Sequence, residues 1–150
     1  MKLILYTGPI KELGKALGKN LGKLIQEQLP QIQIEAIDSA EGLSRLLCRP
    51  LNRISVIIIF VNCEEDLRGF LTLEPLFDNI RRILVLPERT TAMMSMGLQL
   101  NPSFISYWDS EFLDIISVLK KIYHRHEEIG QWHAGIEKSQ DRTIIKFKNE

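Results

Sequence analysis

One stretch decides the fold of this chain: Ile54-Ser55-Val56-Ile57-Ile58-Ile59-Phe60-Val61. Only Ser55 interrupts its apolar character, and such a run is typical of a central parallel strand that is covered on both faces. Parallel strands need crossover connections, which are usually helices that pack on the faces of the sheet. The stretch therefore predicts an α/β fold in which strands and helices alternate.

The sequence on either side repeats this alternation. We expect strands over residues 3–6, 32–36, 54–61, 83–86 and 104–108, and helices over residues 10–29, 38–47, 64–79, 90–100 and from 109 onward. Asp38 and Asp109 are the expected caps of the second and the last helix. The second strand alternates apolar and polar residues, which indicates a half-exposed edge. Together these units predict a doubly wound, five-stranded parallel sheet of flavodoxin-like order 2-1-3-4-5.

Length and composition set the remaining bounds. The balance of 19 basic and 19 acidic residues argues against a dedicated nucleic-acid binder. The apolar run at the N-terminus, residues 3–6, is too short for a signal peptide or a membrane span. Cys48 and Cys63 lack metal-ligand spacing, which indicates buried free thiols in a cytoplasmic protein. We expect one domain over residues 1–129 and a tail or arm over residues 130–150, either frayed or adding a strand at residues 143–148.

The size, the strand order and the sequence from Ala92 through Asn101-Pro102-Ser103-Phe104 to Tyr107-Trp108 resemble a bacterial response-regulator receiver (CheY-like) domain, over roughly residues 1–125. The signature residues of that family are replaced. Its paired magnesium-binding acids correspond to Tyr6-Thr7-Gly8, and its phospho-accepting aspartate to Phe60-Val61-Asn62. Its hydroxyl residue corresponds to Pro87, and its lysine to Tyr107.

The resemblance thus implies a degenerate receiver. An aspartyl phosphate needs a carboxylate nucleophile and a divalent cation, and the sequence offers neither at these positions. We expect a non-catalytic pseudo-receiver that acts as a regulatory protein–protein interaction module in signal transduction, with no catalytic residue, metal or cofactor. The alternative is a small flavodoxin-like enzyme, or a nucleotide- or flavin-binding domain, that uses the carboxyl ends of the strands. Thr7-Gly8-Pro9, before a helix N-terminus, is where such a domain would hold phosphate.

The fourth helix carries apolar residues nearly all round, although a helix on a sheet needs only one apolar stripe. In receivers, the fourth helix, fifth strand and fifth helix form the surface that binds partners. We therefore predict that a protein partner or a second copy of the chain binds a surface made of Met93, Met94, Met96, Leu98, Tyr107 and Trp108. Deeper burial of the helix in the core is the alternative.

The first helix contains a four-residue repeat over residues 13–23, in which Gly14, Gly18 and Gly22 form one stripe. An interior glycine costs a helix about 1 kcal/mol relative to alanine. The structural interpretation is that Gly14 and Gly18 let the helix approach the sheet or the last helix closely. A second stripe is basic and forms a candidate anion-binding face, with a solvated face as the alternative; it contains Lys11, Lys15, Lys19 and Lys23.

Overall fold

The computed structural model describes residues 1–7, 12–49 and 53–142, with side chains over residues 1–7, 15–49 and 53–128. The chain divides into two units, Met1–Ser117 and Val118–Glu150. The first unit contains every strand of the described chain. The last helix, α5 (Leu113–Arg142), begins in the first unit and continues through the second. The sequence indicated a tail from residue 130, and its candidate strand at residues 143–148 lies outside the described residues.

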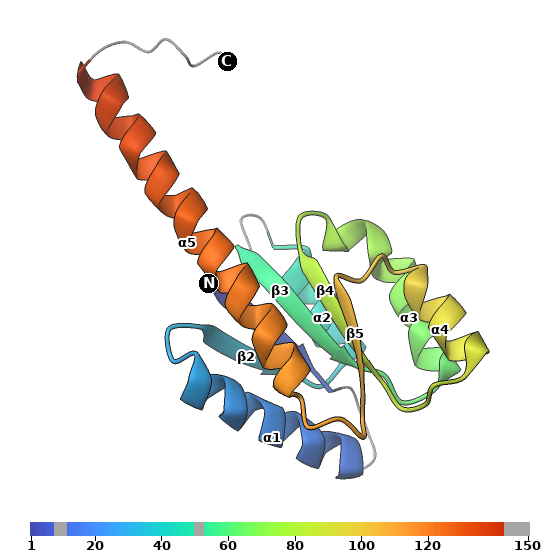
Figure 1. The fold of residues 1–150 in the computed structure, drawn as a ribbon. Coiled ribbons are helices and arrows are strands. Elements are labelled where there is room, and N and C mark those ends of the chain that lie inside the picture. Colours follow the sequence, from blue (N-terminus) through green and yellow to red (C-terminus); the bar gives the residue numbers. More distant parts are fainter. Residues whose placement is uncertain (8–11, 50–52, 143–150) are drawn as a thin grey trace. The chain divides into compact units, whose positions relative to one another are not determined.

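The first unit is built on a five-stranded sheet (Figure 1). The strands are β1 (Lys2–Tyr6), β2 (Gln33–Ile37), β3 (Ile54–Phe60), β4 (Arg81–Leu86) and β5 (Phe104–Tyr107). They lie in the order β2-β1-β3-β4-β5, and every neighbouring pair is parallel. The predicted architecture is confirmed. β3 is central and almost wholly buried, as its apolar sequence requires.

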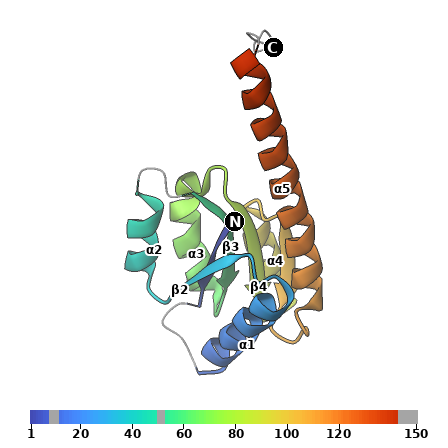
Figure 2. The same ribbon diagram turned by 90° about the vertical axis from the view of Figure 1, so that its left-hand side faces the viewer.

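Helices cover both faces of this sheet (Figure 2). They are α1 (Glu12–Gln28), α2 (Ala40–Leu47), α3 (Glu64–Leu73), the 3-10 turn η1 (Glu74–Phe77), α4 (Thr91–Leu98) and the beginning of α5. Leucines of α2, Phe70 of α3 and Met93 of α4 share one core with alternate residues of β1, β3 and β4. On the opposite face, Leu21 and Ile25 of α1 are buried. There the Phe60 ring of β3 meets the Phe112 ring edge to face, with centroids 5.9 Å apart.

Two of the expected helix caps are wrong. Ser39, rather than Asp38, caps α2, because its Oγ accepts a hydrogen bond from the Gly42 amide at 3.0 Å. Asp109 does not cap α5, which begins four residues later, after Phe112 at a positive φ of 64°. The Asp109 carboxylate is instead paired with Arg89.

The two cysteines are free, but both are exposed rather than buried. Cys48 is the C-terminal cap of α2, and Cys63 is the N-terminal cap of α3. Both positions are adjacent to apolar runs in the sequence, which is why burial was expected. The ends of helices lie at the surface even when the neighbouring strand is buried, so the local hydrophobicity was a misleading guide.

One buried cation links three elements of the first unit. The Arg82 side chain of β4 is only 10% exposed. Its Nη2 donates to the Phe77 carbonyl at 2.7 Å, and its Nη1 donates to the Leu100 carbonyl at 3.0 Å. The Glu74 carboxylate lies 3.5 Å from Nη1. Arg82 therefore links η1 and the chain after α4 to β4 through charge-assisted hydrogen bonds to two backbone oxygens.

Candidate functional site

The carboxyl ends of the parallel strands form the rim where ligands bind in folds of this kind. Thr7 follows β1, and its amide donates to the Ile37 carbonyl at 3.2 Å. Asn62 lies two residues beyond β3, and Pro87 follows β4 directly. The candidate phosphate loop Thr7-Gly8-Pro9 lies largely outside the described residues, so only Thr7 is placed. None of these rim residues carries an ionisable side chain.

A carboxylate near the end of β3 is held by its own loop. Asp66 Oδ2 accepts from the Asn62 amide at 3.1 Å and from Asn62 Nδ2 at 3.0 Å. The asparagine Oδ1 is buried without a hydrogen-bond partner in the described structure. Asp66 thus fixes the turn that leads into α3. These hydrogen bonds give Asp66 a structural role that needs no bound ligand.

Tyr6, at the end of β1, is a titratable group whose pKa this rim shifts. Its hydroxyl belongs to a side chain that is almost wholly buried. Burial raises the pKa of Tyr6 above 10.0, and the negative charges of Asp66 and Asp38 raise it further. Both effects disfavour a phenolate, so Tyr6 is neutral at ordinary pH. Over the described residues, no group of three or more His, Cys, Asp or Glu side chains is arranged to hold a metal ion.

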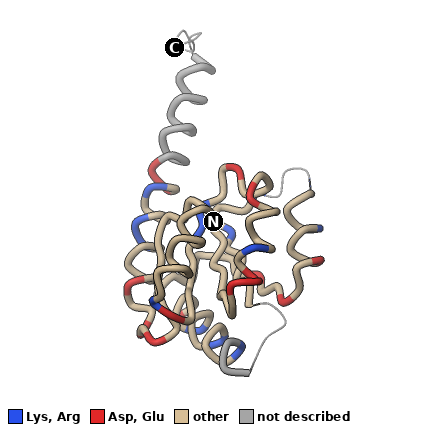
Figure 3. The backbone as a smooth tube through the Cα atoms, turned by 90° about the vertical axis from the view of Figure 1, so that its right-hand side faces the viewer, with Lys and Arg blue, Asp and Glu red and all other residues tan. Residues whose placement is uncertain are grey.

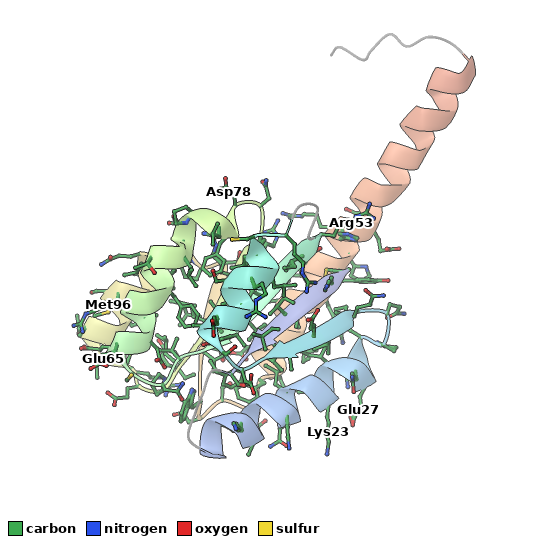
Figure 4. The ribbon with its side chains drawn as sticks, turned by 180° about the vertical axis from the view of Figure 1, so that it is seen from behind. Lys23, Glu27, Arg53, Glu65, Asp78 and Met96 are labelled. Atoms are coloured by element: carbon green, nitrogen blue, oxygen red, sulfur yellow. The ribbon has the colours of Figure 1, made fainter. Side chains whose placement is uncertain are left out.

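A second region lies where α4 meets β5, and we call it the α4–β5 surface: Arg89, Met94, Met96, Leu98 and Tyr107. The Tyr107 hydroxyl donates to the Met94 sulfur at 3.0 Å. The Arg89 guanidinium stacks over the Tyr107 ring, 4.2 Å from its centroid. Leu98 is 58% exposed, while Met94 and Met96 are half-buried. Met96 is labelled on α4 in Figure 4.

Arg89 is oriented from its other side by Asp109. Arg89 Nη1 donates to Asp109 Oδ2 at 2.7 Å, across the loops that follow β4 and β5. This hydrogen bond lowers the pKa of the Asp109 carboxyl. The sequence interpretation missed the pair, because the two residues are 20 positions apart. The adjacency of β4 and β5 was the signal that would have brought these two loops together.

The other residues of the predicted interaction surface are less accessible. Met93 is buried in the hydrophobic core that also contains residues of α2 and α3. Trp108 is half-buried, and its amide donates to the Leu86 carbonyl at 2.9 Å. Its indole Nε1 is buried, and no described residue accepts a hydrogen bond from it. Met93 therefore supports the fold rather than the α4–β5 surface.

A groove of about 640 Å³ runs between α1 and the edge strand β2, and we call it the α1–β2 groove. Its apolar lining includes Leu5, Gly18, Gly22, Ile34 and Ala36. Three of the four predicted anion-face lysines also line it: Lys15, Lys19 and Lys23. Lys11 lies outside the described residues. The groove brings the glycine stripe and the lysine stripe of α1 to one place.

Comparison with known proteins bears on the fold. No family model matches the sequence, and no curated protein matches it. A solved CheY-like response regulator from Mesorhizobium loti superposes with a TM-score of 0.60 at 12% sequence identity, over 81% of this chain and 97% of that chain. The chain has the CheY-like fold. At 12% identity the similarity concerns the path of the backbone. It assigns no function to any residue of the candidate site.

Proposed function

We propose that this chain is a non-catalytic, receiver-like regulatory module that binds a protein through the α4–β5 surface, with a second copy of itself as the partner. The observation that carries the proposal is the exposed Leu98 side chain beside two half-buried methionines. Residues four apart share one face of a helix, so Leu98 and Met94 present a continuous apolar strip. Such strips are common at interfaces and uncommon elsewhere on single domains.

The surroundings of that strip support a contact with protein. The Tyr107 ring is fixed between the Met94 sulfur and the Arg89 guanidinium. Tyrosine and arginine are enriched among residues that dominate binding energy at interfaces. Because these side chains are already held by one another, binding would cost them little conformational entropy. The Arg89–Asp109 pair supplies charges of both signs, which is compatible with a self-complementary contact.

The strand-end rim supports the non-catalytic part of the proposal. By the resemblance to receivers, the paired acids correspond to Tyr6-Thr7-Gly8, the phospho-accepting aspartate to Phe60-Val61-Asn62, and the lysine to Tyr107. A phosphoryl group transferred there would lack both a nucleophilic carboxylate and a metal-ion ligand set. Of the acids that follow β3, Asp66 is engaged with Asn62, and Glu64 lies 4.0 Å from Arg68. Regulation by binding, without phosphoryl chemistry, is consistent with this arrangement.

The test is sedimentation equilibrium of the wild type and of the double variant Met94→Glu, Leu98→Lys over a range of concentrations. We expect the wild type to dimerise and the double variant to remain monomeric with unchanged helix content. Glu41→Lys, Arg45→Glu is the control, because both residues are exposed and belong to α2, which is no part of the α4–β5 surface. It should leave the dimer intact. A wild type that stays monomeric at the highest concentration would contradict self-association through this surface.

A further inference from the structure

The lining of the α1–β2 groove is aliphatic on one side and basic on the other. Its floor is aliphatic, from Leu5 of β1 and from Ile34 and Ala36 of β2. These residues share one face of the sheet, because Leu5 is paired with Ala36 in the register of the two strands. Ala36 is exposed and Ile34 is half-buried. The edge of the sheet therefore presents apolar surface that α1 does not cover.

The wall of the groove on the α1 side is basic. Lys15, Lys19 and Lys23 are exposed, and in the described part of the chain no carboxylate forms an ion pair with any of them. Asp38 is the one acid in the lining, against three lysines. Figure 3 marks the basic positions along the backbone, and Figure 4 labels Lys23 on α1. Lysine stems also add apolar surface while their ammonium groups stay in water.

Close packing of α1 on the sheet does not explain why residue 22, beside the α1–β2 groove, is a glycine. A Cβ at residue 22 would lie 3.7 Å from Leu5 Cδ2, which is an ordinary contact. The helix thus bears a glycine penalty of about 1 kcal/mol at a position where alanine would fit. Gly18 differs, because a Cβ there would meet Thr7. A side chain at residue 22 would, however, fill part of the groove.

We propose that the α1–β2 groove binds a small anionic amphiphile, with its carboxylate or phosphate head against Lys15, Lys19 and Lys23 and its alkyl body on the floor. A volume of about 640 Å³ suits a small molecule, since ligand pockets commonly span roughly 300–1,000 Å³. A nucleic acid could pair its phosphates with the lysines but has no alkyl group to contact the aliphatic floor. An uncharged lipid would use the floor but leave the lysines unmatched.

The experiment is calorimetric titration of the delipidated full chain with monomeric laurate, with dodecanol, inorganic phosphate, a DNA oligonucleotide and phosphatidylglycerol vesicles as separate arms. We expect laurate to bind at least about tenfold more tightly than dodecanol, a difference of roughly 1.4 kcal/mol. Phosphate and DNA should bind weakly or not at all. Binding to vesicles or DNA without binding to laurate would overturn the proposal.

Variants then locate the site. Lys15→Gln, Lys19→Gln, Lys23→Gln should weaken laurate binding about tenfold or more, since each lysine contributes charge at the head group. The control Lys120→Gln, Lys121→Gln, Arg125→Gln changes the net charge equally at exposed positions and should leave affinity unchanged. Gly22→Leu and, independently, Ala36→Phe should block the groove while the circular dichroism spectrum is retained. Full laurate affinity in both the lysine variant and the folded blocked variants would refute the site.

Discussion

Gly18 of α1 lies against Thr7 at the end of β1 so closely that a Cβ at residue 18 would fall 2.5 Å from Thr7 Cγ2. Real Cβ atoms do not approach other carbons to that distance. The threonine side chain is branched at Cβ and has few alternative rotamers, so it has limited freedom to move away. The close approach of helix and strand that the glycine repeat predicted is thus confirmed at Gly18.

Gly18→Ala should therefore destabilise the chain, by roughly 1–3 kcal/mol, through overpacking against Thr7. Thr7→Ser removes Cγ2 and should restore most of that loss in the double variant. Gly22→Ala is the control, because its Cβ has space, and it should stabilise by up to about 1 kcal/mol. Urea unfolding measures all four proteins. Equal effects of alanine at residues 18 and 22 would contradict the packing argument.

Arg82 should be essential to stability although it is part of neither candidate surface. Arg82→Met removes hydrogen-bond donors to the Phe77 and Leu100 carbonyls and should lower the free energy of unfolding by roughly 1–3 kcal/mol. Arg82→Lys keeps the charge but loses the planar fork, and it should recover only part of the stability. Arg81→Met, at the exposed neighbour, should change stability by less than about 0.5 kcal/mol. Indistinguishable denaturation midpoints for residues 81 and 82 would show that the buried bonds are unimportant.

Tyr6 should make the chain sensitive to alkaline pH. Because its pKa is raised in the folded state, the folded chain favours the neutral phenol more strongly than the unfolded chain does. That stabilisation is fully present below pH 10 and is lost as pH rises through the raised pKa of folded Tyr6. Tyr6→Phe should flatten this loss in urea unfolding measured on both sides of pH 10, whereas Tyr123→Phe should not. Parallel pH profiles for the wild type and Tyr6→Phe would exclude the effect.

The chain should not accept a phosphoryl group. We expect its intact mass to stay unchanged after incubation with acetyl phosphate and magnesium, since Phe60-Val61-Asn62 offers no carboxylate at the position that the resemblance assigns to the phospho-accepting aspartate. A receiver with the complete acidic set, treated in parallel, provides the positive control. A stoichiometric gain of one phosphoryl group on this chain would remove the non-catalytic part of the proposed function.

The architecture was predictable because it depends on patterns that repeat over several residues. The apolar run of β3 predicts a central strand, and the half-polar pattern of β2 predicts an edge strand. Neither prediction needs information about the rest of the chain. Caps were less predictable, since Ser39 and Asp38 are both good capping residues and the choice depends on where the backbone turns. Asp109 was misassigned because its local signal competes with a partner, Arg89, that only the folded sheet brings near.

The candidate surfaces were predictable in composition and not in geometry. On α4, the excess of apolar residues was visible, but which of them points inward depends on the helix phase, and Met93 proved to be buried while Leu98 is exposed. On α1, the glycine and lysine stripes were visible separately. Their meeting over Ile34 and Ala36 follows from the pairing of β1 with β2, which no pattern within residues 13–23 contains.

The α1–β2 groove also affects local opening of the folded chain. α1 has three glycines in its interior and is held to the sheet along one side, by Leu21 and Ile25. Such an element opens locally at a lower free energy than the strands at the centre of the sheet. Backbone amides of α1 should then exchange with solvent deuterium well before those of β3 and β4. A molecule seated in the groove would slow that exchange, so the helix itself would report when the groove is occupied.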